Sequence, residues 1–141
     1  MDCQVGKHMS FDIFVIRSEN GKDAPIPLDV IEQAFGPFIK YREPAGWELS
    51  FPDGGRTFVY IKEGDEVHHF NVNRPASSPE LWTALLEILR QTGTVLFWPG
   101  GGAVVGDDSS IAHLMPAIAE IFGTPIIARE GAEIVQLIER S

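Results

Sequence analysis

Three consecutive glycines followed by two adjacent carboxylates are the residues of this sequence with the clearest chemical potential. Gly100, Gly101 and Gly102 follow an apolar segment, and Asp107 and Asp108 close the run. Glycines let a backbone approach its neighbour closely, and successive backbone N–H groups at the start of a helix can bind an anion such as phosphate. Another strand, a helix, a ligand or a partner protein could also fill the space that the glycines leave.

The residues after the glycines argue against a phosphate site. Gly101 and Gly106 have the spacing of a Walker loop, but Asp107 and Asp108 stand where that loop needs Lys and then Ser or Thr. The dinucleotide fingerprint fails as well, because Val105 occupies the position of its third glycine. Two carboxylates would repel phosphate, so we expect no nucleotide and no other cofactor.

Two interpretations of the glycine run remain. In the first, it is a strand end that packs closely under a helix, with Asp108 or Ser109 as the helix N-cap. In the second, a tryptophan beside a flexible glycine loop is a contact platform for a protein partner. The second interpretation predicts these partner-binding residues: Trp98, Gly100, Gly101, Gly102, Asp107 and Asp108.

The same segment offers neither a convincing metal site nor a nucleophile. His113 could join Asp107 and Asp108 on a cation, but more than one helical turn separates it from the acids and no further ligand is indicated. Ser109 and Ser110 lack the Gly-x-Ser-x-Gly context of a nucleophile elbow. We therefore expect no metal and no catalytic residues, and we favour a binding role over an enzymatic one.

A second group of polar residues follows a strand in the middle of the chain. Alternate residues of a strand share a face, so His69, Asn71 and Asn73 point one way while the apolar set around Phe70 points toward the core. Amides and imidazole both donate and accept hydrogen bonds, as ligand recognition requires. His69, Asn71, Asn73 and Arg74 are the alternative ligand-binding site, and a solvated sheet face is the simpler explanation of the same pattern.

Apolar periodicity predicts the elements that position these residues. Strands are expected at 10–17, 47–51, 56–62, 66–73, 94–98, 103–105 and 124–128; helices are expected at 28–35, 79–92, from a cap at 107–109 to 122, and around 134–138. Pro116 is expected to kink the third helix without breaking it, because the apolar stripe continues in phase. The predicted fold class is α+β: a mixed, largely antiparallel sheet with four helices in a single-domain α/β sandwich.

Length and cysteine content limit the organisation of the chain. Its 141 residues fit one domain, which we place at 9–141. Residues 1–8 end in His before Met9 and resemble a cloning remnant, so we expect a vector-derived or disordered segment there. The single cysteine, Cys3, lies in that segment, which argues against disulfides, thiol catalysis and cysteine zinc sites.

Charge limits the classes of partner. The formal net charge of −9 repels nucleic acid and anionic membrane and favours a basic protein partner. No apolar run approaches the roughly 18 residues that span a bilayer, so a cytoplasmic location is expected.

The strand at 10–17 and the segment from Trp98 to Met115, together with the size and acidity of the chain, suggest a family. In these features the chain resembles the small cytoplasmic immunity proteins that bacteria encode beside polymorphic or contact-delivered toxins. The resemblance implies stoichiometric binding that blocks a toxin, with carboxylates facing a basic cleft. The alternatives are a small-molecule-binding or hydrolytic domain that uses His69, Asn71 and Asn73, and a homo-oligomer subunit packed through its glycine strand.

Overall fold

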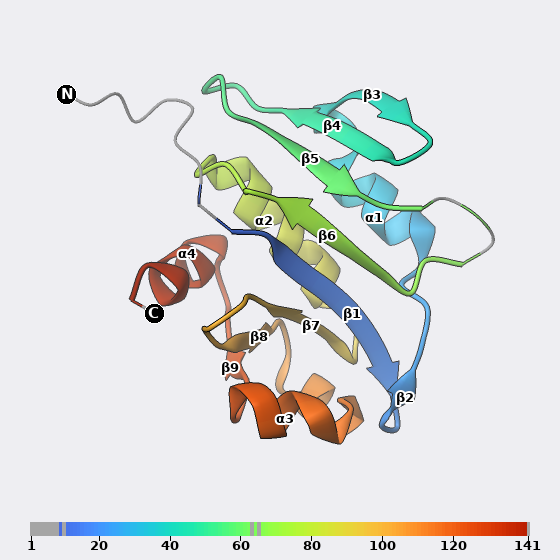
Figure 1. Cartoon of the computed structure of the whole chain (residues 1–141), viewed down its shortest axis with the longest axis vertical. Helices are drawn as coiled ribbons and strands as arrows, with labels where there is room; N and C mark the ends of the chain where they lie inside the picture. The colour runs from blue at the N-terminus through green and yellow to red at the C-terminus, as the bar shows by residue number, and fades with distance from the viewer. Residues whose placement is uncertain (1–8, 10, 63, 65, 141) are drawn as a thin grey trace.

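The structure is a computed structural model that describes residues 9, 11–62, 64 and 66–140, and a mixed sheet runs through its centre (Figure 1). Nine strands form this sheet in the described part of the chain, in the order β3-β4-β5-β6-β1-β7-β8-β9, with β2 paired to β1. They are β1 (Ile13–Glu19), β2 (Lys22–Asp23), β3 (Ile39–Glu43), β4 (Gly46–Ser50), β5 (Arg56–Tyr60), β6 (His69–Asn73), β7 (Thr94–Phe97), β8 (Ala103–Val105) and β9 (Ile126–Ile127). Only the β8–β9 pair among these strands is parallel, which confirms the predicted mixed, largely antiparallel sheet.

Four α-helices accompany the sheet in the described residues, as the sequence predicts. They are α1 (Leu28–Phe35), α2 (Pro79–Leu89), α3 (Pro116–Phe122) and α4 (Gly131–Arg140), with short 3-10 segments η1 (Gly36–Phe38) and η2 (Asp108–His113). The helix α2 packs between α1 and α4. The observed fold class is therefore α+β.

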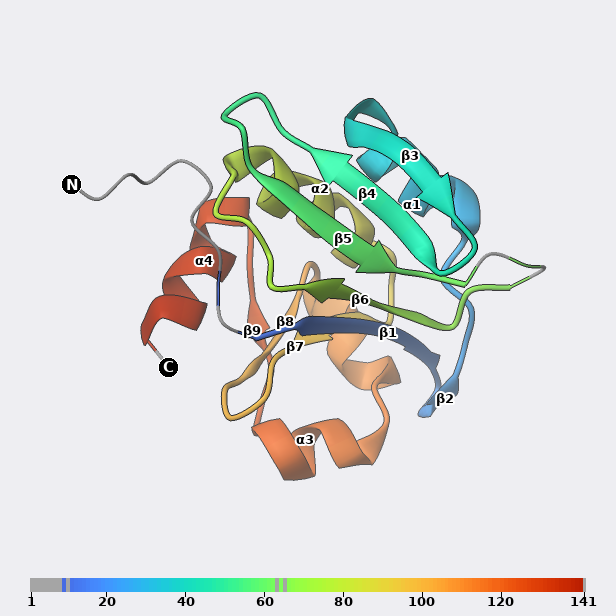
Figure 2. The same cartoon turned by 45° about the horizontal axis from the view of Figure 1, so that its top comes forward.

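The helices divide between the two faces of the sheet, and this division decides which residues stay exposed. Side chains alternate along β7, so Leu96 enters the main core beneath α1, α2 and α4, while Val95 packs in a smaller cluster with α3 and η2. The smaller cluster lies only on the half of the sheet formed by β1, β7, β8 and β9. On the α3 side of the sheet, no helix of the described residues covers β3, β4, β5 and β6 (Figures 1 and 2).

The prediction that Pro116 kinks one continuous third helix is wrong. The structure has the 3-10 segment η2, a break, and then α3, because Leu114 and Met115 are extended, with ψ of 149° and 140°. Pro116 is the first residue of α3. Proline disfavours helical backbone in the residue before it, so here it starts a helix instead of kinking one.

The N-cap residues of α2 and η2 make no side-chain cap bonds. Ser78 occupies the N-cap position of α2, but its hydroxyl donates to the Asp53 carboxylate at 2.6 Å and makes no cap bond. This contact and the Gly55 N–H lower the pKa of Asp53. Asp107 likewise precedes η2 without a side-chain cap bond. Both residues therefore join loops to helices through side-chain contacts.

The predictions for residues 1–8, Cys3 included, lie outside the described residues. In the part of the chain that is described, no helix combines the length and apolar character needed to cross a membrane.

Candidate functional site

Trp98 explains the glycine run. Its side chain is only 3% exposed, and the β7–β8 loop folds back against it. A Cβ atom added at Gly101 would lie 1.6 Å from the indole nitrogen, so only glycine fits there. Gly100 has φ +74°, a left-handed turn conformation that glycine adopts at no steric cost. Because the ring is buried under its own loop, Trp98 offers little exposed aromatic surface to the partner that the sequence predicts.

The predicted partner-binding residues lie at the two ends of the short strand β8. Gly100 to Gly102 precede the strand β8, whereas Asp107 and Asp108 follow it, so the length of that strand separates the two groups. Asp107 and Asp108 are exposed, and Asp107 accepts a hydrogen bond from the Ser109 hydroxyl. The close approach to a helix occurs at Gly106, where a Cβ would lie 2.7 Å from the backbone of Leu89 in α2.

His113 and Ser110 have structural contacts. The His113 ring nitrogen Nδ1 accepts a hydrogen bond from the Asn20 backbone N–H at 3.1 Å, and the His113 carbonyl accepts one from Gly21 at 3.0 Å. The buried Ser110 hydroxyl accepts one from the Gly93 N–H at 2.9 Å. Both residues therefore hold turns beside β1. Among the described residues no group of three His, Cys, Asp or Glu side chains could hold a metal ion.

The second predicted group lies on the uncovered half of the sheet, which we call the open face. The open face carries the outward side chains of four adjacent strands: Tyr41 from β3, Glu48 from β4, Arg56, Phe58 and Tyr60 from β5, and His69, Asn71 and Asn73 from β6. The alternation predicted for β6 is confirmed, because Phe70 and Val72 are buried in the main core. The structure therefore brings His69, Asn71 and Asn73, which we call the amide strip, together with residues from three other strands.

One carboxylate fixes the two amides of this strip. Asp12 Oδ2 accepts a hydrogen bond from Asn71 Nδ2, and Asp12 Oδ1 accepts one from Asn73 Nδ2, both at 3.0 Å. Asp12 Oδ1 also accepts the backbone N–H of Arg74 at 3.0 Å. Because the carboxylate can only accept, it turns the NH₂ group of each amide toward itself. Each amide keeps one N–H and its carbonyl oxygen for another partner.

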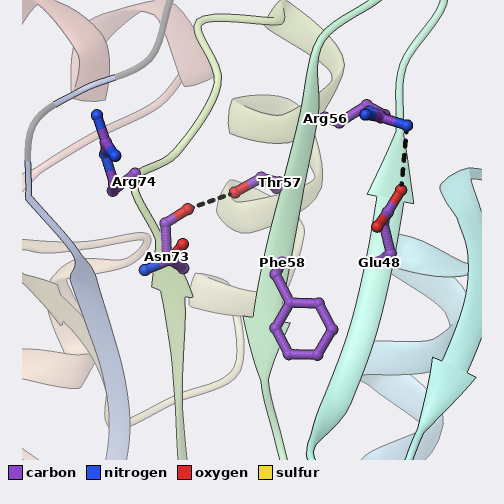
Figure 3. Close-up of a pocket in the computed structure, with 6 residues that line it drawn as sticks. All are labelled: Glu48, Arg56, Thr57, Phe58, Asn73 and Arg74. Atoms are coloured by element: carbon purple, nitrogen blue, oxygen red, sulfur yellow. Dashed lines mark hydrogen bonds and ion pairs between the residues drawn. The ribbon is translucent and has the colours of Figure 1, made fainter.

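Aromatic side chains flank the amides. Phe58 lies opposite Asn73 and Tyr60 opposite Asn71 in the β5–β6 register, and the two rings meet edge to face with centroids 4.9 Å apart. The Phe58 ring leans toward β4 (Figure 3). Gly46 on β4 makes room for it, because a Cβ at Gly46 would lie 2.8 Å from the ring. Tyr60 remains 45% exposed. The strip therefore has a partly apolar wall on its β5 side.

Charged groups lie beyond that wall. The Tyr41 hydroxyl donates to Glu48 Oε1 at 2.7 Å, and this bond raises the pKa of the Tyr41 phenol because it stabilises the protonated form. Arg56 lies 3.6 Å from the other oxygen of Glu48 (Figure 3). The Glu48 carboxylate is thus shared between a hydroxyl and a guanidinium.

Two hollows adjoin the amide strip, one at each end. The hollow at the Asn73 end has a volume of about 360 Å³ and is lined by Glu48, Arg56, Thr57, Phe58, Asn73 and Arg74 (Figure 3). The hollow at the Asn71 end, of about 510 Å³, includes Tyr60, Lys62, Glu66, His68 and His69 in its lining. Arg74 has φ +40°, a left-handed conformation that is uncommon for a residue other than glycine, and Asp12 holds its N–H.

His68 lies at the border of the second hollow. Its ring contacts the carboxylates of Asp23 on β2 and Glu66 before β6, the latter at 3.1 Å. The hydrogen bond to Glu66 and the nearby charge of Asp23 raise the pKa of this imidazole above its ordinary value. His68 therefore joins β2 to the segment before β6, two segments that are far apart in sequence.

Sequence reasoning missed most of the open face. The Asp12 contacts join residues 59 to 62 positions apart, which no periodicity reveals. The available signal was the alternation along β5, which places Arg56, Phe58 and Tyr60 on one face of the strand. Alternation of this kind is typical of a sheet that is covered on one face only.

The fold and the site define an α+β protein with one sheet face half covered and a fixed row of amides on the uncovered half. The chain matches no protein-family model, no curated protein and no solved structure.

Proposed function

We propose that this chain is a non-enzymatic, acidic binding protein of the bacterial cytoplasm that neutralises or regulates a protein partner, in the manner of an immunity protein. The open face, rather than the loop around Trp98, is the contact surface in this proposal. Asp107 and Asp108 remain exposed carboxylates that a basic partner can also reach.

The observation that carries the proposal is the uncovered aromatic and amide surface of β3 to β6. A sheet face without a covering layer normally carries polar residues, but Tyr41 and Tyr60 are each 45% exposed on this one, and Phe58 is half-buried beside them. Exposed aromatic residues next to fixed hydrogen-bonding groups are typical of protein interfaces. The net charge of −9 favours association with a basic partner.

Site-specific photocrosslinking in the native cell tests this proposal. A benzophenone amino acid replaces Tyr60 or Tyr41 on the open face, and the same group replaces Glu139 on α4 as a matched exposed control. We expect a discrete adduct with one partner protein from both tyrosine positions and none from Glu139. Tyr60→Ala should then weaken the purified complex at least about tenfold, as truncation of a central aromatic residue does.

Two results would contradict the placement. The same group is also placed at Asp108, and a discrete adduct from that position, with none from positions 41 and 60, would return the partner to the Asp107–Asp108 loop. Absence of a discrete adduct at all of these positions would reject a protein-binding role for both surfaces.

Small-molecule binding or hydrolysis at the His69, Asn71 and Asn73 strip is the second candidate, and the hollows at both ends of the strip favour it. A pure metabolite that raises the melting temperature of the wild type but not of Asn73→Ala would support this role. The homo-oligomer alternative was based on a glycine strand free to pack against a second copy. Gly101 instead packs against Trp98 of the same chain, and β8 lies inside the sheet.

A further inference from the structure

The amide strip has the geometry of a receptor for an extended backbone. Asn71 and Asn73 are two residues apart on β6, so their side chains repeat at about 6.8 Å along the strand. An extended peptide lying along β6 presents a backbone N–H and C=O toward the same side at this repeat. The two asparagines can therefore pair with the main chain of two alternate peptide residues, one asparagine to each. This pairing does not depend on the side chains of the peptide.

The amides are already oriented for this role. Asp12 holds the NH₂ groups of both through bonds of 3.0 Å, and both side chains are half-buried between neighbouring strands. Because they are held in place before binding, little side-chain entropy is lost when a peptide arrives. The remaining N–H and carbonyl oxygen of each amide supply one donor and one acceptor.

Apolar side chains border the strip on both sides. Phe58 and Tyr60 stand on the β5 side, and Phe14, the cross-strand neighbour of Asn71, stands on the β1 side. Phe14 is fixed by stacking on Phe97, with ring centroids 5.6 Å apart. Alternate side chains of an extended peptide would point toward these rings while its main chain follows the amides.

A positive group ends the strip. Arg74 follows Asn73 directly, is exposed, and lines the hollow of about 360 Å³ at that end. Glu48, the acidic residue in the lining, already accepts from Tyr41 and lies 3.6 Å from Arg56. Arg74 thus places an exposed positive charge at this end of the strip, beside the Asp12 carboxylate that accepts its backbone N–H, and its guanidinium can bind a carboxylate of a partner.

From these contacts we infer that the open face binds an extended segment of the partner protein, with its main chain on Asn71 and Asn73, an apolar side chain against Phe58 and Tyr60, and a carboxylate at Arg74. The inference rests on the proposed function and specifies the chemistry of the partner. The segment is locally acidic, even where the partner is basic overall. Overall charge then governs encounter, and Arg74 governs the register in which the segment lies.

Selection from a phage-displayed library of random linear peptides tests the inference. Wild-type protein should enrich peptides in which Asp or Glu stands at a fixed distance from an apolar residue. Exchange of that acid for Asn or Gln in a synthetic peptide should weaken binding at least about tenfold, since a charge-assisted contact is lost.

Variants of the protein separate recognition from folding. Arg74→Gly keeps the left-handed backbone, which glycine adopts readily, and removes the guanidinium. It should weaken the selected peptide at least about tenfold, and Arg74→Glu should shift the selection toward Lys and Arg. Arg90→Glu, an equal change of charge at an exposed position after α2, is the matched control and should leave both results unchanged.

The inference is overturned if the library yields no common pattern, or if Arg74→Glu and Arg90→Glu select the same peptides as the wild type. If that happens while the Tyr60 crosslink still captures a partner, the protein-binding function stands and only the extended, acidic segment is rejected. Loss of the crosslink as well would reject both.

Discussion

At the scale of single residues, burial decides what Trp98 can do. The sequence places an aromatic ring beside three glycines, and the same pattern suits an exposed platform or a ring covered by its own loop. The structure has the covered ring, since a Cβ at Gly101 would overlap the indole. The glycine run is thus a packing feature of the β7–β8 loop, and the exposed aromatic residues lie on other strands.

Substitution of Gly101 tests this packing. Gly101→Ala should lower the free energy of unfolding by about 1–3 kcal/mol, because the buried indole must move to make room for the methyl group. Gly102→Ala is the control: its Cβ would meet the same ring at 3.9 Å, an ordinary contact, and should change stability by less than about 0.5 kcal/mol. Urea unfolding followed by tryptophan fluorescence measures both. Equal midpoints for the two variants would show that the ring does not need the glycine.

At the scale of elements, the sequence predicts what is periodic and misses what depends on neighbours. The alternation in β6 identified the buried and exposed faces correctly, because one face meets a core. The strand β3 was not predicted, since it lies at the sheet edge and exposes most of its residues, which leaves no apolar pattern. The apolar stripe around Pro116 continued in phase across a break, because η2 and α3 pack on the same cluster.

The candidate site follows the same rule. The amide strip could be predicted from the spacing within one strand. The aromatic residues beside it come from β5, and the carboxylate that fixes its amides comes from Asp12; only the fold brings these residues near the strip. The order of strands along the sheet was not encoded in any local pattern. The full open face therefore required the structure.

The link between β2 and the start of β6 should depend on pH. The pKa of His68 is raised in the folded protein, so its contacts with Asp23 and Glu66 stabilise the fold fully below the unfolded value of 6.5. This stabilisation is lost as the pH rises through the higher, folded pKa. His68→Gln should therefore reduce the urea midpoint more at about pH 5.5 than at about pH 8.5. The same reduction at both values would show that the charge of the imidazole does not contribute.

At the scale of the whole molecule, the sheet separates two cores of unequal size. The main core contains most of the buried side chains and joins α1, α2 and α4 to every long strand, whereas the second cluster has four buried residues, Val95, Ala103, Val105 and Ile118. Ile118 is the buried residue of α3, and Ile121 on the same helix is 70% exposed. A layer with so few buried contacts is expected to open before the rest of the molecule.

Native-state hydrogen exchange can detect this opening. Ile88→Val removes one methylene from the main core and should lower the protection of amides in β1 and β7 by about 1 kcal/mol, because those amides exchange through global unfolding. Amides of α3 should keep their wild-type protection, since they exchange through a local opening that leaves the main core intact. Ile118→Val, the matched substitution on the other face, should lower protection in α3 itself. An equal loss in α3 and β1 for Ile88→Val would mean that both layers unfold as one unit. The expected separation keeps β5 and β6 folded while α3 opens, so the open face retains its amides and aromatic wall throughout such fluctuations.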